Sequence, residues 1–316
     1  MGTEYPLMVS VSGMYGTGSS ALLSLLSECD LFRIIPGETK LFESGLAELC
    51  VSLMNGHDIS SNIDRTERNM LTYGSKKRAY TRLGCYVDRV VNTNSGNVYP
   101  QGYAKVFPLY YRAVQDFFHD LRELDPQKAR DIDRVSILKN FFQVLLGDLS
   151  LNDGQIPVLD QLVKPIYPVL SSAIPFAKVI VVTRDPRDQF CDIIRNRLPW
   201  RRKPQFNLPA GLRCQRFVAE YRKRLKAADA FFEATKYNKN IMHCRFEDLA
   251  LNTEQEYERI VRFCTNLDVH QDVNLQFART HSSFDRERAQ SRIGLYKRWA
   301  FRKEIELIEM ELEWWV

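Results

Sequence analysis

Near the amino terminus, glycines alternate with hydroxyl residues in a pattern suited to holding an anion. The loop consists of Gly13, Met14, Tyr15, Gly16, Thr17, Gly18, Ser19 and Ser20. Glycines permit positive-φ turns and close backbone approach to a ligand, while the hydroxyls add hydrogen-bond donors. An apolar run precedes the loop and a helical pattern follows it, so its N–H groups can surround a phosphate. We predict phosphate binding here; a tight turn with a serine cap is the plainer alternative.

The glycine spacing also suggests which ligand the loop holds. Gly13-x-x-x-x-Gly18-x-Ser20 matches a nucleoside-triphosphate P-loop, except that Ser19 stands where the motif requires lysine. A nucleotide is therefore expected, but ATP hydrolysis is not. In the alternative of a degenerate kinase or NTPase, Mg²⁺ would be held by Ser20 and an acidic strand end, for which Asp160 is the obvious donor.

A second charged segment follows another apolar run. Residues 177–183 lead into Arg184-Asp185-Pro186-Arg187-Asp188 and then into a helical pattern. Taken alone, this segment could also be a capped helix with proline in its first turn and arginines at the surface. Together with the glycine-rich loop, it favours an anion-binding site built from two strand ends.

The elements that position these residues alternate between strand and helix. We expect strands at 6–13, 31–37, 156–164, 177–183 and 240–246, and helices at 19–30, 252–264 and 302–315. Pro36 and Gly37 are expected to end the second strand. Short β-branched runs are typical of parallel strands buried on both faces. The sequence thus predicts a doubly wound, mainly parallel α/β sheet in one domain, residues 1–316, with a mostly helical insertion at about 44–152.

Composition narrows the class of partner and the compartment. The 316 residues are 45% apolar and 26% charged, as in ordinary globular proteins, and the net charge of +5 is too small to indicate nucleic-acid binding. Seven scattered cysteines without a C-x-x-C pair, together with the lack of a signal peptide or membrane span, favour a cytoplasmic protein. None of the five histidines has metal-ligand spacing, and no metal is expected.

Taken in order, these motifs resemble those of the sulfotransferases that use 3′-phosphoadenosine 5′-phosphosulfate (PAPS). The resemblance extends to Gly37-Glu38-Thr39-Lys40-Leu41-Phe42, Val163-Lys164-Pro165, Arg245-Phe246-Glu247-Asp248-Leu249 and Ser291-Arg292-Ile293-Gly294. It implies that residues 13–20 hold the 5′-phosphosulfate and that Arg184 and Arg292 bind the 3′-phosphate. The segment from Gly37 is similar to that of the family's glycan-modifying branch, which implies Glu38 as general base. The implied acceptor is a hydroxyl or amine of a carbohydrate or glycolipid-like molecule.

The sequence departs from the family pattern at two positions. Gly16 stands where the family usually has a cation that neutralises the leaving phosphate, and losing such a stabiliser typically costs ~3 kcal/mol. Either Lys164 or Lys40 replaces it, with Lys164 favoured, or the protein is a weak or non-catalytic nucleotide-binding relative. Asp192 stands where the family has a serine at the 3′-phosphate, and we expect Arg195 to pair with it.

Overall fold

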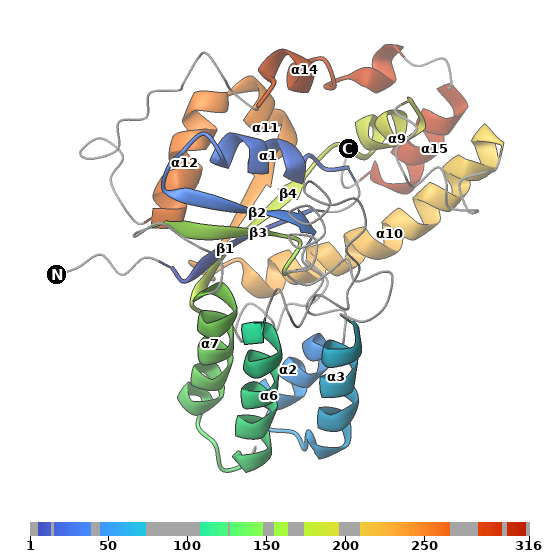
Figure 1. Ribbon diagram of the computed structural model, residues 1–316. Coiled ribbons are helices and arrows are strands. Elements are labelled where there is room, and N and C mark those ends of the chain that lie inside the picture. The colour runs from blue at the N-terminus through green and yellow to red at the C-terminus, as the bar shows by residue number, and fades with distance from the viewer. Residues whose placement is uncertain are drawn as a thin grey trace, which may run out of the picture.

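The core of the molecule is a five-stranded, all-parallel sheet. The computed structural model describes residues 6–13, 16–38, 45–73, 108–125, 127–147, 155–163, 174–195, 209–265, 284–298 and 302–313. The strands are β1 (Met8–Gly13), β2 (Phe32–Glu38), β3 (Ile156–Asp160), β4 (Ala177–Thr183) and β5 (Ile241–Arg245), in the order β2-β3-β1-β4-β5. Helices flank this sheet, which confirms the predicted α/β class (Figure 1).

Apolar side chains cover both faces of the sheet, as a parallel sheet requires. Along β4, Val179 and Val181 face one layer, whereas Ile180 and Val182 face the other. The second layer is formed by α1 (Ser19–Leu26), α11 (Phe246–Leu251) and α12 (Thr253–Thr265). The opposite face packs against Phe231 of α10 (Ala210–Thr235) and against the helical insertion.

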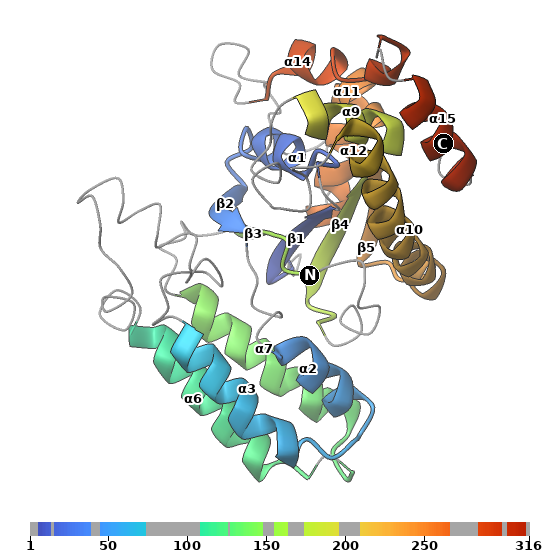
Figure 2. The same ribbon diagram turned by 90° about the vertical axis from the view of Figure 1, so that its right-hand side faces the viewer.

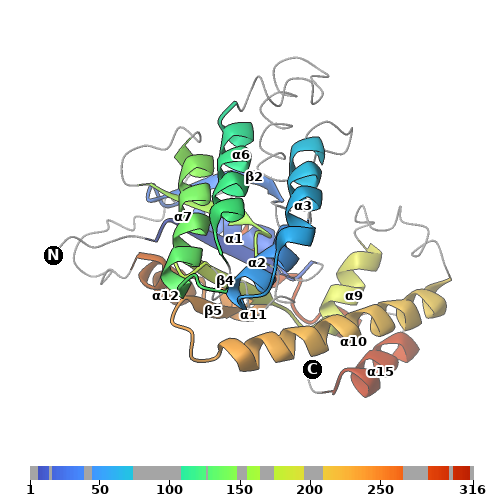
Figure 3. The same ribbon diagram turned by 90° about the horizontal axis from the view of Figure 1, so that it is seen from below.

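Four helices form the described part of the insertion. They are α2 (Leu46–Met54), α3 (Ser60–Tyr73), α6 (Pro108–Glu123) and α7 (Asp131–Gly147), and the residues described between 45 and 147 contain no strand. They lie together on the side of the sheet that faces away from α1 (Figures 2 and 3). Phenylalanines in contact, such as Phe117 and Phe141 with ring centroids 4.6 Å apart, belong to one hydrophobic core with Met8, Ile35 and Leu159 of the strands.

A third core lies beside β4 and is built largely by a helix that sequence reasoning missed. The long helix α10 packs against α9 (Pro186–Arg195), η5 (Leu295–Arg298) and α15 (Arg302–Glu311). Its buried side chains include Cys214, Phe217, Val218, Tyr221, Leu225 and Ala228. Their spacing of three and four residues is a helical period that would have predicted α10.

Several predicted element boundaries were wrong. Pro36 and Gly37 do not end the second strand, because β2 continues to Glu38 after a register shift that begins at Ile35. β2 is an edge strand, where proline and such irregularities are tolerated. β3 ends at Asp160, and the helices expected at 19–30 and 302–315 end at Leu26 and Glu311. β5 is the strand at the opposite edge.

The described cysteines are buried and free. They are Cys29, Cys50, Cys191, Cys214, Cys244 and Cys264, while Cys85 lies outside the described residues. Burial raises the pKa of the Cys191 thiol to about 12. Across the ranges described, no helix is long and apolar enough to cross a membrane.

Candidate functional site

The carboxyl ends of the strands bring the chemically interesting segments to one edge of the sheet. Gly13 at the end of β1 is in register with Val182 of β4, and Thr183 is in register with Arg245 of β5. From β1 the chain passes through α1 to β2 on one side, whereas β4 lies on the other side of β1. Ligands of open α/β sheets bind at such a point, where the strand order reverses.

The glycine-rich loop ends in a helix amino terminus that is open to an anion. Gly16 and Gly18 have φ of +73° and +99°, and Gly18 occupies the N-cap position of α1. Within the described residues, no side chain caps this helix, and its first turn contains no acidic residue. The first N–H groups of a helix have no intrahelical partner and are therefore available to a phosphate, whose binding by residues 13–20 stays a prediction. Thr17 is buried, whereas Ser20 is exposed.

A glutamine that sequence reasoning missed holds the start of the loop. Gln161 follows β3 directly, with φ of +60°. With its amide oriented to satisfy both groups, it donates to the Gly13 carbonyl (3.1 Å) and accepts from the Gly13 N–H (3.2 Å). Two serines of β1 bind the turn that contains Gln161. The Ser12 hydroxyl donates to the Val163 carbonyl, and the Ser10 hydroxyl accepts from the Val163 N–H. Gln161 could have been found from its position at the carboxyl end of a strand, because ligands of open α/β sheets bind there.

Arg184 links the loop to the rest of the site. It follows β4 and is 4% exposed. Nη1 donates to the Gly16 carbonyl (3.2 Å) and to Asp192 (2.8 Å), and Nη2 donates to the Arg292 carbonyl (2.8 Å). Nε is buried without a hydrogen-bond partner among the described residues. The two segments predicted to bind phosphate therefore meet.

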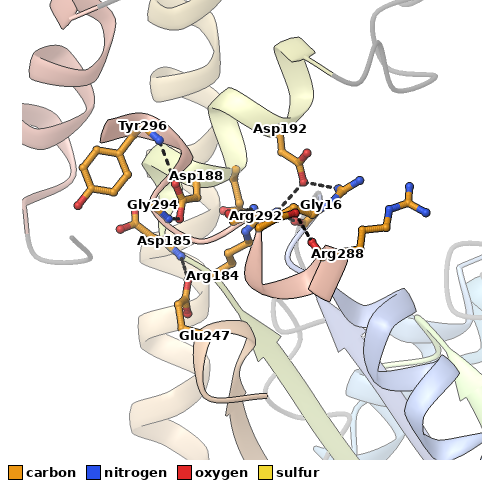
Figure 4. A network of polar contacts seen from close by, with 12 residues as sticks. Gly16, Arg184, Asp185, Asp188, Asp192, Glu247, Arg288, Arg292, Gly294 and Tyr296 are labelled. Carbon is orange, nitrogen blue, oxygen red and sulfur yellow. Dashed lines mark hydrogen bonds and ion pairs between the residues drawn. The ribbon is translucent and has the colours of Figure 1, made fainter. Parts of the chain in front are cut away.

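Asp192 lies between the two arginines that were expected to bind the 3′-phosphate (Figure 4). Its Oδ2 accepts from Arg184 at 2.8 Å and from Arg292 at 2.7 Å. The side chain of Arg195, which was expected to pair with Asp192, lies outside the described set, so that pairing stays a prediction. Arg292 comes from the turn after α14 (Arg286–Gln290), far along the chain from α9.

A second buried aspartate of α9 holds this C-terminal turn in place. Asp188 accepts from the N–H of Gly294 at 2.7 Å and from that of Tyr296 at 3.2 Å. Burial raises the pKa of the Asp188 carboxyl, while the two backbone donors act in the opposite direction. Asp185 accepts from the N–H of Arg187 at 2.8 Å, so the start of α9 is capped as the plainer reading predicted. The segment is thus both a capped helix and part of the site.

The Phe246 ring packs between Gly18 and Arg184. The ring lies 4.7 Å from the guanidinium carbon of Arg184, and an added Cβ at Gly18 would collide with it. The close packing explains why position 18 is glycine. The sequence pointed to the segment that contains Phe246 but not to the contacts of its ring with Gly18 and Arg184. Contacts between distant segments leave no local sequence pattern.

The structure brings together the loop residues Gly13, Gly16, Thr17, Gly18 and Ser19 with Arg184, Asp192 and Arg292. Ser20 follows in the first turn of α1. The backbone of Glu38 ends β2 in register with Asp160, with β3 between it and β1. The side chain of Glu38, together with Tyr15, Lys40 and Lys164, lies outside the described set. No group of residues that could hold a metal ion occurs in the described ranges.

Comparison with known proteins places one region in a family. Residues 165–271, which include Arg184, Asp192 and Phe246, match the model of the Sulfotransferase family. The match covers about a third of the chain and agrees with the predicted family, although it does not distinguish the glycan-modifying branch. No curated protein matches the sequence.

Two solved structures are similar at low sequence identity. The sulfotransferase domain of the Synechococcus PCC 7002 olefin synthase is 10% identical, with a TM-score of 0.46, over 97% of this chain and 95% of that one. Sulfotransferase STF9 from Mycobacterium avium is 13% identical, with a TM-score of 0.38, over 84% of this chain and 65% of that one. Both TM-scores are low, and the α/β class therefore rests on the five-stranded parallel sheet of this chain.

Proposed function

Because residues 165–271 match the sulfotransferase family, we propose that this chain moves a sulfuryl group from PAPS to a hydroxyl or amine of a carbohydrate or glycolipid-like acceptor. One observation supports this most strongly: Arg184 donates to the carbonyl of Gly16, so the two phosphate-binding candidates belong to one site. A nucleotide with phosphates at both ends of its ribose matches such a pair of segments.

The described residues fit the 5′ end of such a donor. The uncapped amino terminus of α1 offers backbone N–H groups, and, apart from its chain neighbours, no atom of the described residues lies within 4 Å of a Cβ added at Gly16. A phosphate bound there would also be stabilised by the positive end of the helix dipole. Bound at this point, the donor would supply the sulfuryl group, while the loop would hold and orient its 5′-phosphate.

Two further roles follow from the family resemblance and stay proposals. Glu38 would take the proton of the acceptor, since β2 ends at the same sheet edge as the loop. Lys164, or else Lys40, would supply the cation that Gly16 cannot. Such a cation stabilises negative charge on the leaving phosphate, which is usually the largest single contribution to this kind of catalysis.

Calorimetric titration tests the proposed function directly. We expect 3′-phosphoadenosine 5′-phosphate (PAP), the product nucleotide, to bind without added metal and more tightly than ATP with Mg²⁺. A preference for ATP with Mg²⁺ would reject the proposal in favour of a degenerate kinase or NTPase. Binding of PAP without turnover of PAPS on any carbohydrate acceptor would instead indicate a non-catalytic nucleotide-binding protein.

The role of Glu38 predicts a loss of turnover without a loss of binding. In Glu38→Gln, PAPS consumption with acceptor should fall by about 10²-fold or more, because a positioned base typically contributes that much. The affinity for PAP should stay unchanged. Glu123→Gln, at the exposed end of α6, is the matched control and should keep full activity. Full activity of Glu38→Gln would show that another group is the base.

A further inference from the structure

The pair of arginines expected to bind a 3′-phosphate already holds an anion from the protein itself. The Asp192 side chain is 6% exposed, and a single oxygen accepts from both guanidinium groups. Arg184 is equally enclosed, with 2% of its side chain exposed, while Arg292 is 26% exposed. A carboxylate bridging two guanidinium groups uses the same charge-assisted hydrogen bonds that a phosphate would.

The donors of Arg184 show why the two anions would compete. Nη1 already donates to Asp192 and to the carbonyl of Gly16, and Nη2 donates to the carbonyl of Arg292. A nitrogen of this group carries two hydrogens, so both hydrogens of Nη1 are in use. A phosphate could take the donor that points to Asp192 only if the carboxylate moved away.

The charge of Asp192 is a second reason why it would oppose binding of a 3′-phosphate. The two arginines and Asp192 together carry one net positive charge, whereas a phosphate monoester carries nearly two negative charges at neutral pH. An ionised carboxylate beside it would repel it. The position of Asp192 therefore reduces what Arg184 and Arg292 can contribute to binding a 3′-phosphate.

We propose that Asp192 sets the nucleotide specificity of this site by competing with a ribose 3′-phosphate for Arg184 and Arg292. The inference rests on the proposed function, because it requires an adenine nucleotide whose 5′ end lies at the glycine-rich loop. It follows that the 3′-phosphate adds little to affinity in this protein, and that the 5′ end provides most of the binding. Removing the charge of Asp192 frees both arginines for the 3′-phosphate.

Titration with two nucleotides that differ only in the 3′-phosphate tests the proposal. PAP and adenosine 5′-phosphate (AMP) are each titrated into the wild type, Asp192→Asn and Asp192→Ser. In the wild type, PAP should bind less than about 10-fold more tightly than AMP, a small gain for a group facing two arginines. In both variants the affinity for PAP should rise about 10-fold or more, as one freed charged hydrogen bond allows, with AMP unchanged. Asp116→Asn, an exposed aspartate of α6, makes the same change in net charge and should alter neither affinity.

Each outcome bears on one of the two proposals. If wild-type protein binds PAP about 100-fold or more tightly than AMP, Asp192 does not compete and the inference is wrong. The same holds if folded Asp192 variants keep the wild-type ratio of the two affinities. The ratio of PAP to AMP affinity in the wild type tests the competition by Asp192 even if the variants do not fold. If neither nucleotide binds to any of the proteins, the proposed function itself fails.

Discussion

Replacing Arg184 by methionine is expected to weaken PAP binding by about 10-fold or more, chiefly by releasing the glycine-rich loop that holds the 5′ end, and to lower the free energy of unfolding by about 3–5 kcal/mol. Arg184 is nearly inaccessible and connects the glycine-rich loop, α9 and the turn at Arg292. Methionine matches its length but offers no donor. Asp192 would then stay buried without its ion pair to Arg184, and the loop would lose the hydrogen bond that joins it to the residue after β4.

Urea denaturation and calorimetry measure these two effects separately. Arg222→Met is the matched control, because its ion pair with Glu311 lies at the surface and typically contributes less than about 1 kcal/mol. The double variant Arg184→Met with Asp192→Asn should lose less stability than the sum of the single changes, since removing the carboxylate also removes the buried charge that had lost its ion pair with Arg184. A wild-type unfolding midpoint in Arg184→Met would show that the network does not stabilise the fold.

Local patterns predicted the parts of the site that lie within single strand–loop–helix units. The glycine-rich loop could be found because an apolar run, three glycines and a helical period follow one another in twenty residues. Arg184 could be found for the same reason, since the strand-forming run 177–183 leads directly to it. Both patterns reflect backbone preferences that act over a few residues, and such preferences can be read without knowing the fold.

Contacts between distant segments were beyond the reach of the sequence. Local spacing suggested Arg195 as a partner of Asp192, but it gave no sign of the ion pair with Arg292, a hundred residues away in the chain. Which arginine reaches a carboxylate depends on how α9 packs against the turn after α14, and Asp188 determines that packing through Gly294 and Tyr296. The strand that continues through Pro36 shows the same limit, because only its place at the sheet edge makes proline acceptable.

The loop itself leads to the second large prediction, that Gly18→Ala lowers the free energy of unfolding by about 2–5 kcal/mol and weakens PAP binding with it. Two costs add at this position. A φ of +99° is unfavourable for alanine, and the added methyl group would meet the Phe246 ring, which is buried between the loop and Arg184. To relieve the collision, either the amino terminus of α1 or the ring must move. Either movement disturbs the N–H groups that are proposed to hold the 5′-phosphate.

Two other glycines separate these costs. Gly16→Ala has an unfavourable φ of +73° but open space around the new methyl group, so it should lose only about 1–2 kcal/mol. Gly211→Ala, in the first turn of α10, has neither problem and should be neutral or stabilise by up to about 1 kcal/mol. Chemical denaturation of the three variants should therefore rank them in the order Gly18, Gly16, Gly211, from most to least destabilised. Equal losses at positions 18 and 16 would mean that Phe246 does not pack against the loop, and that Arg184 and the loop are held together without it.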